Sequence, residues 1–343
     1  MSRIKVRHYR IVMPGGDNRP ERPVRAVMIG DLHNRIFGEA NKQLVEIIQK
    51  QYPDVVFSVG DLTVSKANEE TNLDVGVSLL KRLACDCPVY CVNGNHEFRA
   101  KIYPEDYRGV YQKLVSELQK GGIALLENTR AQIEVNGARL IVHGLEIPMK
   151  YYKRFSGDFM TAEEIRALIG EPEEGCYNIL LAHNPIFFES YALWGADLTL
   201  SGHLHGGLVR IPLIGGLISP QVKLFPKYAQ GMFEKYRRKM VVTAGPGDQE
   251  RGAGASGPCR GLGQRPKNLC RSTKRERCER PSGSKKRGSL QVKRREGRKG
   301  PSSACRKSPP AAAFSARSLR NVCAQGRKLP ARPAKPGDTI SFL

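Results

Sequence analysis

Five short polar motifs, each placed directly after a predicted apolar strand, constrain this chain more than any other feature. They hold five of its seven histidines. In order they are Gly30-Asp31-Leu32-His33, Gly60-Asp61, Gly94-Asn95-His96-Glu97, Ala182-His183-Asn184 and Gly202-His203-Leu204-His205-Gly206. An α/β fold presents its site loops at strand ends. Histidine, aspartate and asparagine are ligands that suit Mn, Fe or Zn. The ordered set therefore predicts a metal site, whereas any one motif alone would indicate only a turn or a helix cap.

The first half of the chain alternates apolar runs with amphipathic segments. The runs at 25–30, 55–59 and 88–92 are predicted to be buried strands, and each leads into a polar motif. The spacing of apolar residues predicts helices over 39–51 and 70–84. We therefore expect successive strand–helix units with their polar loops at one edge of a sheet.

The second half has a different pattern. Asn136-Gly137 joins two short strand-like runs, which is a strong signal for a tight hairpin. Thr161 with Glu164 has the spacing of a capping box that opens a short helix. The other predicted elements are a helix over 107–120 and strands over 178–182, 197–200, 209–211 and 240–243. Parallel units followed by antiparallel ones predict an α/β (α+β) fold of two packed mixed β-sheets flanked by helices.

The positive charge of the chain is concentrated toward its C-terminus. Of the net charge of +23, residues 1–246 carry +4 (31 Lys and Arg, 27 Asp and Glu) and 247–343 carry +19 (25 and 6). The second segment lacks Trp and Tyr and has few aliphatic residues, so it buries too little apolar surface to offset its ordering entropy. We expect a globular domain over 1–246 and a disordered, low-complexity basic tail over 247–343.

Cysteine usage and hydropathy bear on the cellular compartment. The nine cysteines include no Cys-x-x-Cys pair, so neither a zinc ribbon nor a disulfide framework is predicted. The N-terminal residues lack the apolar core of a signal peptide. No run approaches the roughly 20 apolar residues of a membrane span. We expect a cytoplasmic protein, with a peripheral position at the inner face of the cell membrane as the alternative.

At these motifs the chain resembles the calcineurin-like metallophosphoesterase superfamily, and within it the bacterial branch of small, often membrane-associated phosphoesterases. The resemblance covers about residues 4–246. It extends to Pro53-Asp54-Val55-Val56, Leu180-Leu181-Ala182-His183-Asn184-Pro185, Leu200-Ser201-Gly202-His203 and Phe225-Pro226-Lys227-Tyr228. It implies a four-layer sandwich of two mixed sheets between helices, in agreement with the pattern-based prediction.

The resemblance also implies a ligand set for two divalent metal ions, which would be Mn, Fe or Zn. It assigns the first ion to Asp31, His33 and His205, the second to Asn95, His183 and His203, and the bridge between them to Asp61. A shared carboxylate lets two cations lie about 3.5–4 Å apart. Their remaining positive charge binds phosphate and lowers the pKa of a bound water.

His96 ligates neither metal in this family. The resemblance makes it a catalytic residue that faces the substrate, where it would protonate the leaving oxygen or stabilise charge on phosphorus, with Glu97 beside it. The implied reaction is in-line attack of a metal-bound hydroxide on a phosphomonoester or phosphodiester. We therefore expect a metal-dependent phosphoric ester hydrolase.

Two positions depart from the family pattern. Relatives commonly follow the His-x-His pair with Gly-Gly-Gln, whereas this chain has Gly206-Gly207-Leu208, which leaves substrate contacts beyond the metals unassigned. Relatives also continue their last strand through Gly-Leu-Gly-Thr, whereas Pro246-Gly247-Asp248-Gln249 follows here. A one-base shift of the reading frame at Pro246 can convert Pro-Gly-Asp-Gln into Leu-Gly-Thr-Lys. We hypothesise that the tail is a frameshift product, which sequencing of the genomic locus would test.

Other conspicuous residues have simpler interpretations. His143 ends a predicted strand outside every motif, so a structural role is favoured, and His8 is expected on a surface strand. Lys150-Tyr151-Tyr152-Lys153-Arg154 mixes aromatic residues with cations, and a solvated loop is favoured over a contact with an anionic substrate or a membrane. The apolar segment 211–218 is compatible with a lip for a lipid-bearing substrate and with ordinary packing.

The expected partner is a phosphate-ester small molecule or a lipid-linked substrate. A pyrophosphohydrolase acting on a nucleotide-linked lipid precursor is the alternative within the enzymes. The alternative outside the enzyme class is a basic nucleic-acid-binding protein whose phosphoesterase site has decayed. It is favoured by two cationic clusters that would attract a phosphate backbone, Lys285-Lys286-Arg287 and Lys293-Arg294-Arg295. Against that alternative, no aromatic residues alternate with these cations for base stacking, and every predicted ligand is present. No specific nucleic-acid partner is therefore expected.

Overall fold

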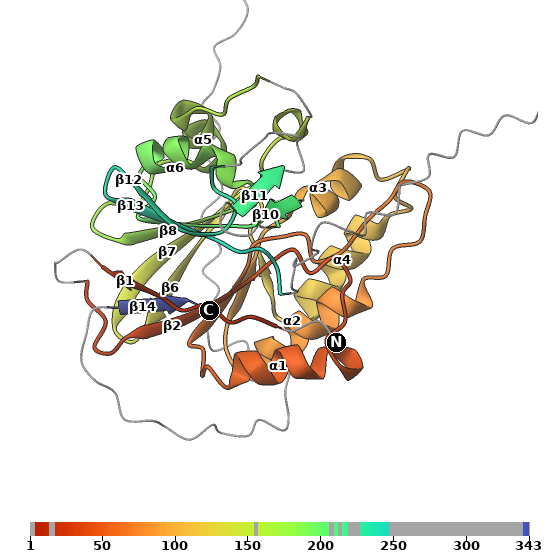
Figure 1. The fold of residues 1–343 in the computed structure, drawn as a ribbon, viewed down its shortest axis with the longest axis horizontal. Coiled ribbons are helices and arrows are strands. Elements are labelled where there is room, and N and C mark those ends of the chain that lie inside the picture. The colour runs from red at the N-terminus through yellow and green to blue at the C-terminus, as the bar shows by residue number, and fades with distance from the viewer. Residues whose placement is uncertain are drawn as a thin grey trace, which may run out of the picture. The chain divides into compact units, whose positions relative to one another are not determined.

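Two six-stranded sheets form the framework of the structure, a computed structural model (Figure 1). It describes residues 4–13, 18–153, 157–205, 209–211, 215–218, 227–246 and 339–342, the backbone alone for the segments 209–211, 215–218 and 339–342. All of them belong to one unit, Met1–Ala255 with Ala311–Leu343. A second unit, Ser256–Pro310, lies outside the described residues. The predicted disordered tail therefore also lies outside them, apart from 339–342.

The first sheet has the strand order β1-β14-β2-β3-β4-β5. Its strands are β1 (Tyr9–Val12), β14 (Thr339–Phe342), β2 (Val24–Ile29), β3 (Val55–Ser58), β4 (Val89–Cys91) and β5 (Ala124–Leu125). β2 to β5 run parallel, as successive strand–helix units require. β14 lies between β1 and β2, antiparallel to the first and parallel to the second. This short part of the tail thus belongs to the sheet.

The second sheet has the order β12-β13-β9-β8-β7-β6. Its strands are β12 (Gly231–Lys235), β13 (Arg238–Val242), β9 (Leu198–Ser201), β8 (Tyr177–Ala182), β7 (Ala138–Leu145) and β6 (Arg130–Val135). The four inner strands are parallel and both edge strands antiparallel. Asn136 (φ 52°) and Gly137 (φ 82°) turn the predicted β6–β7 hairpin, and both have the positive φ of a tight turn. β10 (Val209–Ile211) and β11 (Gly215–Ile218) form a separate hairpin.

Helices cover the outer faces of both sheets (Figure 1). The α-helices are α1 (Lys42–Gln49), α2 (Asp74–Ala84), α3 (Asn95–Ile102), α4 (Val110–Lys120), α5 (Ala162–Ile169) and α6 (Phe188–Trp194). The 3₁₀ helices in the described part of the chain are η1 (Glu39–Asn41), η2 (Met149–Tyr152) and η3 (Pro185–Phe187). None of the helices in the described part of the chain is long and apolar enough to cross a membrane.

Three apolar layers hold the sandwich together. Phe57 and Leu181 are fully buried between the sheets. Leu80 of α2 belongs to the layer that also contains residues of α1, α4 and the outer side of the first sheet. Trp194 of α6 belongs to the layer between α5, α6 and the second sheet. The predicted arrangement of two mixed sheets flanked by helices is confirmed.

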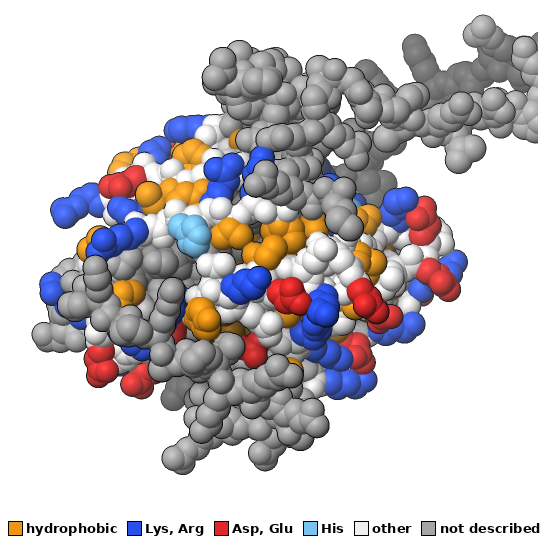
Figure 2. Space-filling view, turned by 60° about the horizontal axis from the view of Figure 1, so that its bottom comes forward, with side chains coloured by type: hydrophobic (Ala, Val, Ile, Leu, Met, Phe, Trp, Pro, Cys, Tyr) orange, Lys and Arg blue, Asp and Glu red, His pale blue; other side chains and the backbone are white. Residues whose placement is uncertain are grey.

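The surface agrees with the nearly balanced charge of residues 1–246. Figure 2 shows Lys and Arg side chains interspersed with Asp and Glu, with hydrophobic side chains between them. Among the described residues visible in this view, Lys and Arg side chains do not form a continuous stripe of the kind that binds a nucleic-acid backbone.

The predicted elements are present, with shifted ends and some additions. The helix expected over 39–51 is divided into η1 and α1, because Ala40 (φ 44°) and Asn41 (φ 62°) leave the helical region. Thr161 caps α5 as predicted: its hydroxyl accepts from the Glu164 N–H at 3.2 Å. The sequence patterns did not predict α3, whose residues show little amphipathic spacing.

Candidate metal centre

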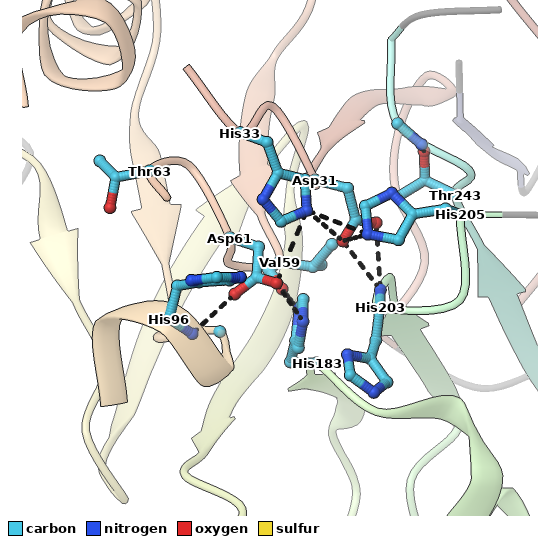
Figure 3. A network of polar contacts seen from close by, with 12 residues as sticks. Asp31, His33, Val59, Asp61, Thr63, His96, His183, His203, His205 and Thr243 are labelled. Carbon is cyan, nitrogen blue, oxygen red and sulfur yellow. Dashed lines mark hydrogen bonds and ion pairs between the residues drawn. The ribbon is translucent and has the colours of Figure 1, made fainter. Parts of the chain in front are cut away.

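The five polar motifs converge at one end of the two sheets (Figure 3). In the first sheet, Asp31 follows β2, Asp61 follows β3, and Asn95 begins α3 after β4. In the second, His183 follows β8, and His203 and His205 follow β9. These strands run parallel within each sheet, so the loops at their carboxyl ends meet.

The turns after the strands hold the backbone in the left-handed region. This conformation is found at five of the predicted ligands, with φ between 49° and 71°: Asp31, His33, Asp61, His203 and His205. For residues other than glycine this backbone costs about 1–3 kcal/mol each and persists only where the surroundings enforce it. The strained turns aim the side chains at a common centre.

Two glycines allow the loops to approach the carboxylates. A Cβ at Gly94 would lie 2.1 Å from Asp61 Oδ1, and one at Gly202 would lie 2.6 Å from Asp31 Oδ2. Because real Cβ atoms essentially never approach this closely, a larger residue would displace the carboxylate or the loop. The glycines of the motifs thus have a steric role at the site.

The first group of ligand atoms consists of Asp31, His33 and His205, which lie within 4.8 Å of one another. His33 Nε2 is 3.0 Å from His205 Nε2, and Asp31 Oδ1 is 3.9 Å from the first and 3.7 Å from the second. Burial lowers the pKa of each of these imidazoles to about 4, and it raises that of Asp31 to about 6. Both imidazoles are therefore neutral at pH 7, with nitrogen atoms able to bind a cation.

The second group consists of Asp61, His183 and His203. His183 Nδ1 donates to the Val59 carbonyl at 2.7 Å, which directs Nε2 toward Asp61 Oδ2 at 3.2 Å. Burial alone would lower the pKa of His183, but the Asp61 charge outweighs burial and raises it to about 9. Reciprocally, burial would raise the pKa of Asp61, and His183 holds it well below its usual value. A cation, either a proton or a metal ion, balances this pair.

Unsatisfied buried atoms support a metal at the second group. Asn95 Oδ1 and His203 Nε2 are buried and have no hydrogen-bond partner among the described residues. A buried acceptor without a partner costs about 1–3 kcal/mol. Both are ligand atoms in the predicted set, and a divalent ion would satisfy them. The donor set of imidazole, carboxylate and amide oxygen fits Mn, Fe or Zn.

Glu97 ties together the two loops that carry Asp61 and Asn95. Its buried carboxylate accepts from the backbone N–H groups of Asp61 at 3.0 Å, Thr63 at 3.1 Å and Gly94 at 2.9 Å. Burial, with Asp61 nearby, raises its pKa. From the sequence, Glu97 was expected to support His96. In the structure its carboxylate binds backbone N–H groups of the neighbouring loops.

His96 lies beside the first group. Its backbone N–H donates to Asp61 Oδ1 at 3.0 Å, and its ring Nδ1 lies 3.3 Å from the Ser65 carbonyl oxygen. The centroid of its ring lies 5.3 Å from that of His33. With Nδ1 donating to Ser65, Nε2 remains available to the site. A ring nitrogen of His96 also lies within 4.8 Å of ligand atoms of His33 and Asp61.

The sequence did not identify Tyr152 as part of this site. Its segment was predicted to be a solvated loop, but the structure forms η2 there, with Tyr151 buried and Tyr152 partly buried. The Tyr152 ring packs edge-on against His203, with centroids 5.1 Å apart. Burial, and to a lesser extent the charges of nearby groups such as Asp61, raise the pKa of the Tyr152 hydroxyl well above its usual value. The only signal in the sequence was the mixture of aromatic and cationic residues, which is also common in surface loops. Arg154 lies outside the described residues.

The remaining histidines lie away from this centre. His143 is buried, with Nε2 3.0 Å from Asn178 Oδ1 and its ring 5.0 Å from that of Trp194, so its contacts are structural. His8 is exposed just before β1. The side chains of the apolar segment 211–218 lie outside what the structure describes.

Comparison with known proteins identifies similar chains. YpbG, an uncharacterized protein of Bacillus subtilis, is 27% identical over 56% of this chain and 65% of its own length. A transmembrane protein with a metallophosphoesterase domain from Danio rerio is 30% identical over 65% of this chain and 48% of its own. The phosphodiesterase YaeI of Escherichia coli is 24% identical over 66% of this chain and 76% of its own. The chain thus spans less than two thirds of the length of the first two.

The match to a family model covers the part of the chain that builds the site. The calcineurin-like phosphoesterase model matches residues 24–207, which extend from β2 to just beyond His205. This range includes all the predicted ligands and more than half of the chain. The chain belongs to the calcineurin-like phosphoesterase family.

Proposed function

We propose that this protein is a dinuclear phosphoesterase that uses the predicted ligand set. One ion would be held by Asp31, His33 and His205, the other by Asn95, His183 and His203, with Asp61 between them. The position of Asp61 carries the proposal: its Oδ2 lies 3.7 Å from His33 Nε2 and 3.2 Å from His183 Nε2, one imidazole from each group. A carboxylate between two imidazole clusters is the arrangement expected of a bridging ligand.

The two metal ions, His96 and Glu97 would have separate roles in the reaction. When bound, the two ions would supply Lewis-acid stabilisation of the phosphoryl oxygens and activate water. His96, oriented by the Ser65 carbonyl, would hold or deliver a proton through Nε2 at the leaving oxygen. Glu97 would hold the Asp61 and Asn95 loops in register. The reaction would be an in-line displacement at phosphorus.

A phosphodiester is the first substrate class to test. Support comes from YaeI, a relative named as a phosphodiesterase that matches 66% of this chain. A phosphomonoester and a nucleotide-linked pyrophosphate are the alternatives, since both present phosphoryl oxygens to the same two sites. A lipid-linked substrate would belong to the latter class.

The activity would reside in 1–246 together with β14, with the rest of 247–343 as a basic tail. The competing function, nucleic-acid binding through the tail, predicts binding that disappears when the basic clusters are removed while hydrolysis persists. The charge distribution favours the enzyme assignment, since residues 1–246 carry only +4.

The deciding experiment is Mn²⁺-dependent hydrolysis of bis-p-nitrophenyl phosphate by the wild-type chain and its Asp61→Asn variant. We expect activity that chelation abolishes and that the variant lacks. Asp86→Asn is the matched control, because Asp86 is exposed and its carboxylate accepts a hydrogen bond from Gln49 Nε2 at 2.7 Å, away from the centre. An Asp61→Asn enzyme as active as the control would contradict the proposed bridge.

A second variant separates metal binding from proton transfer. His96→Gln is expected to lower kcat by about 10²–10⁴-fold, the usual contribution of a general acid or base. Its bound metal, measured by elemental analysis, should equal that of the wild type. Loss of a metal ion from this variant would instead make His96 a ligand.

A further inference from the structure

Tyr152 lies against the second ligand group. Its ring meets that of His203 edge-on, with centroids 5.1 Å apart and an interplanar angle of 74°, and lies 6.4 Å from that of His183. Edge-to-face packing of this kind holds an aromatic ring in a preferred orientation. The position of the hydroxyl at the end of the ring is therefore well defined.

Two adjacent tyrosines of η2 have contrasting surroundings. Tyr151 is buried, and its hydroxyl donates to Glu164 Oε2 at 2.6 Å, which ties η2 to α5. The Tyr152 hydroxyl has no hydrogen-bond partner within the described ranges, and the residue is only partly buried. A tyrosine near the interior usually satisfies its hydroxyl. None of the described residues therefore competes with a ligand for this hydroxyl.

The pKa of the Tyr152 hydroxyl is raised well above its usual value, so the hydroxyl keeps its proton and can donate it in a hydrogen bond. Burial is the main cause of this shift, and the charges of nearby groups, Tyr191 and Asp61 among them, act in the same direction. His96 occupies a different part of the centre, with its ring 5.3 Å from that of His33 in the first group. Two donors thus flank the candidate metal centre, one beside each ligand group.

We propose that the Tyr152 hydroxyl donates a hydrogen bond to a nonbridging oxygen of the substrate phosphoryl group, which makes Tyr152 a second catalytic residue. The inference rests on the proposed function. His96 would serve the leaving oxygen from the side of the first group, and Tyr152 would orient the phosphoryl group from the side of the second. No bond to Tyr152 forms or breaks in this role.

Tyr152→Phe tests the hydrogen bond, because it removes the hydroxyl and retains the ring on His203. We expect kcat/KM for bis-p-nitrophenyl phosphate to fall about tenfold or more, as for the loss of a hydrogen bond to a charged oxygen. Bound metal should be unchanged. Tyr151→Phe is the matched control: the same change one residue earlier removes a hydroxyl engaged by Glu164, and the kinetics should be those of the wild type.

A series of aryl phosphodiesters distinguishes which oxygen is contacted. The loss in Tyr152→Phe should be the same for leaving phenols of low and high pKa, since a nonbridging oxygen does not depart. A loss that grows with the pKa of the phenol would overturn the assignment, and so would a loss of bound metal. A fully active Tyr152→Phe would refute this inference alone, whereas an inactive wild type would refute the proposed function.

Discussion

The Glu97 carboxylate accepts a hydrogen bond from the Asp61 backbone N–H at 3.0 Å, and Asp61 Oδ1 in turn accepts one from the His96 backbone N–H at 3.0 Å. The loop after β3 and the first turn of α3 therefore hold each other in position through two carboxylates. The proposed bridging ligand and the proposed proton donor are thus linked to each other by hydrogen bonds. Because of these contacts, we expect a residue that contacts no metal, such as Glu97, to affect the centre.

Replacing Glu97 by Gln should weaken metal binding although Glu97 is not a ligand. The carboxylate serves three N–H donors, and an amide would place its own N–H₂ against at least one of them. Loss of such supporting contacts typically lowers metal affinity about 10–100-fold. Titration with Mn²⁺ monitored by calorimetry would measure the change. Exposed Glu163→Gln is the control, and an unaltered Mn²⁺ affinity in Glu97→Gln would argue against this role.

Replacing Gly94 by Ala should disrupt the site and lower stability. The new Cβ would lie 2.1 Å from Asp61 Oδ1, so either the carboxylate or the loop must shift. Overpacking of this kind costs about 1–3 kcal/mol. Urea unfolding and diester hydrolysis would both report it. Gly157→Ala is the control, because a Cβ there meets nothing within 4 Å, and equal behaviour of the two variants would contradict the steric argument.

Acid should destabilise the fold partly through His143. Burial lowers the pKa of His143 to about 4, from 6.5 in the unfolded chain. Above pH 6.5 both states are neutral at this residue. As the pH falls below 6.5 only the unfolded chain takes up the proton, so stability declines until about pH 4. The slope from one such group approaches about 1.4 kcal/mol per pH unit.

His143→Leu should therefore flatten the dependence of unfolding free energy on pH between 6.5 and about 4. Asn178 Oδ1, the partner of His143, would still accept from the Glu173 N–H at 2.9 Å, so the loss at neutral pH should be modest. Urea unfolding at several pH values gives the comparison. Parallel curves for wild type and variant would mean that His143 is not a source of acid sensitivity.

Chelation should lower the thermal midpoint of the wild-type protein. The ligand groups bring buried acceptors together, and an ion bound only by the folded state stabilises it by mass action. Differential scanning fluorimetry with EDTA and then with excess Mn²⁺ would show loss and recovery. Asp61→Asn should respond much less to either addition. A wild-type midpoint insensitive to chelator would contradict a metal centre at these residues.

Truncation after Pro246 should lower stability by removing β14. This strand pairs with both β1 and β2, so its loss leaves β1 without its neighbour in the sheet. Deleting Ser256–Pro310 alone retains β14 and is expected to unfold at the wild-type denaturant concentration. If the two shortened chains proved equally stable, β14 would contribute nothing. The comparison also separates hydrolysis from any binding by the basic tail.

Local patterns predicted most of the fold because strand and helix periods depend on neighbouring residues. The Asn136-Gly137 hairpin and the Thr161 cap follow directly from turn and capping chemistry. α3 could not be predicted in this way, since its first turn is organised by Glu97 and the β3 loop. β14 was concealed by the composition of the tail, although 339–342 reads Thr-Ile-Ser-Phe, an alternating strand pattern.

The sequence by itself determined which residue types are available for the centre and in what order, because strand ends and polar motifs are local properties of the chain. Only the tertiary structure decided their distances. His33 Nε2 and His205 Nε2 lie 3.0 Å apart although 172 residues separate them, and Tyr152 reaches His203 from a segment that looks like a surface loop. Such contacts depend on the packing of two sheets against each other, and no pattern of neighbouring residues encodes that packing directly.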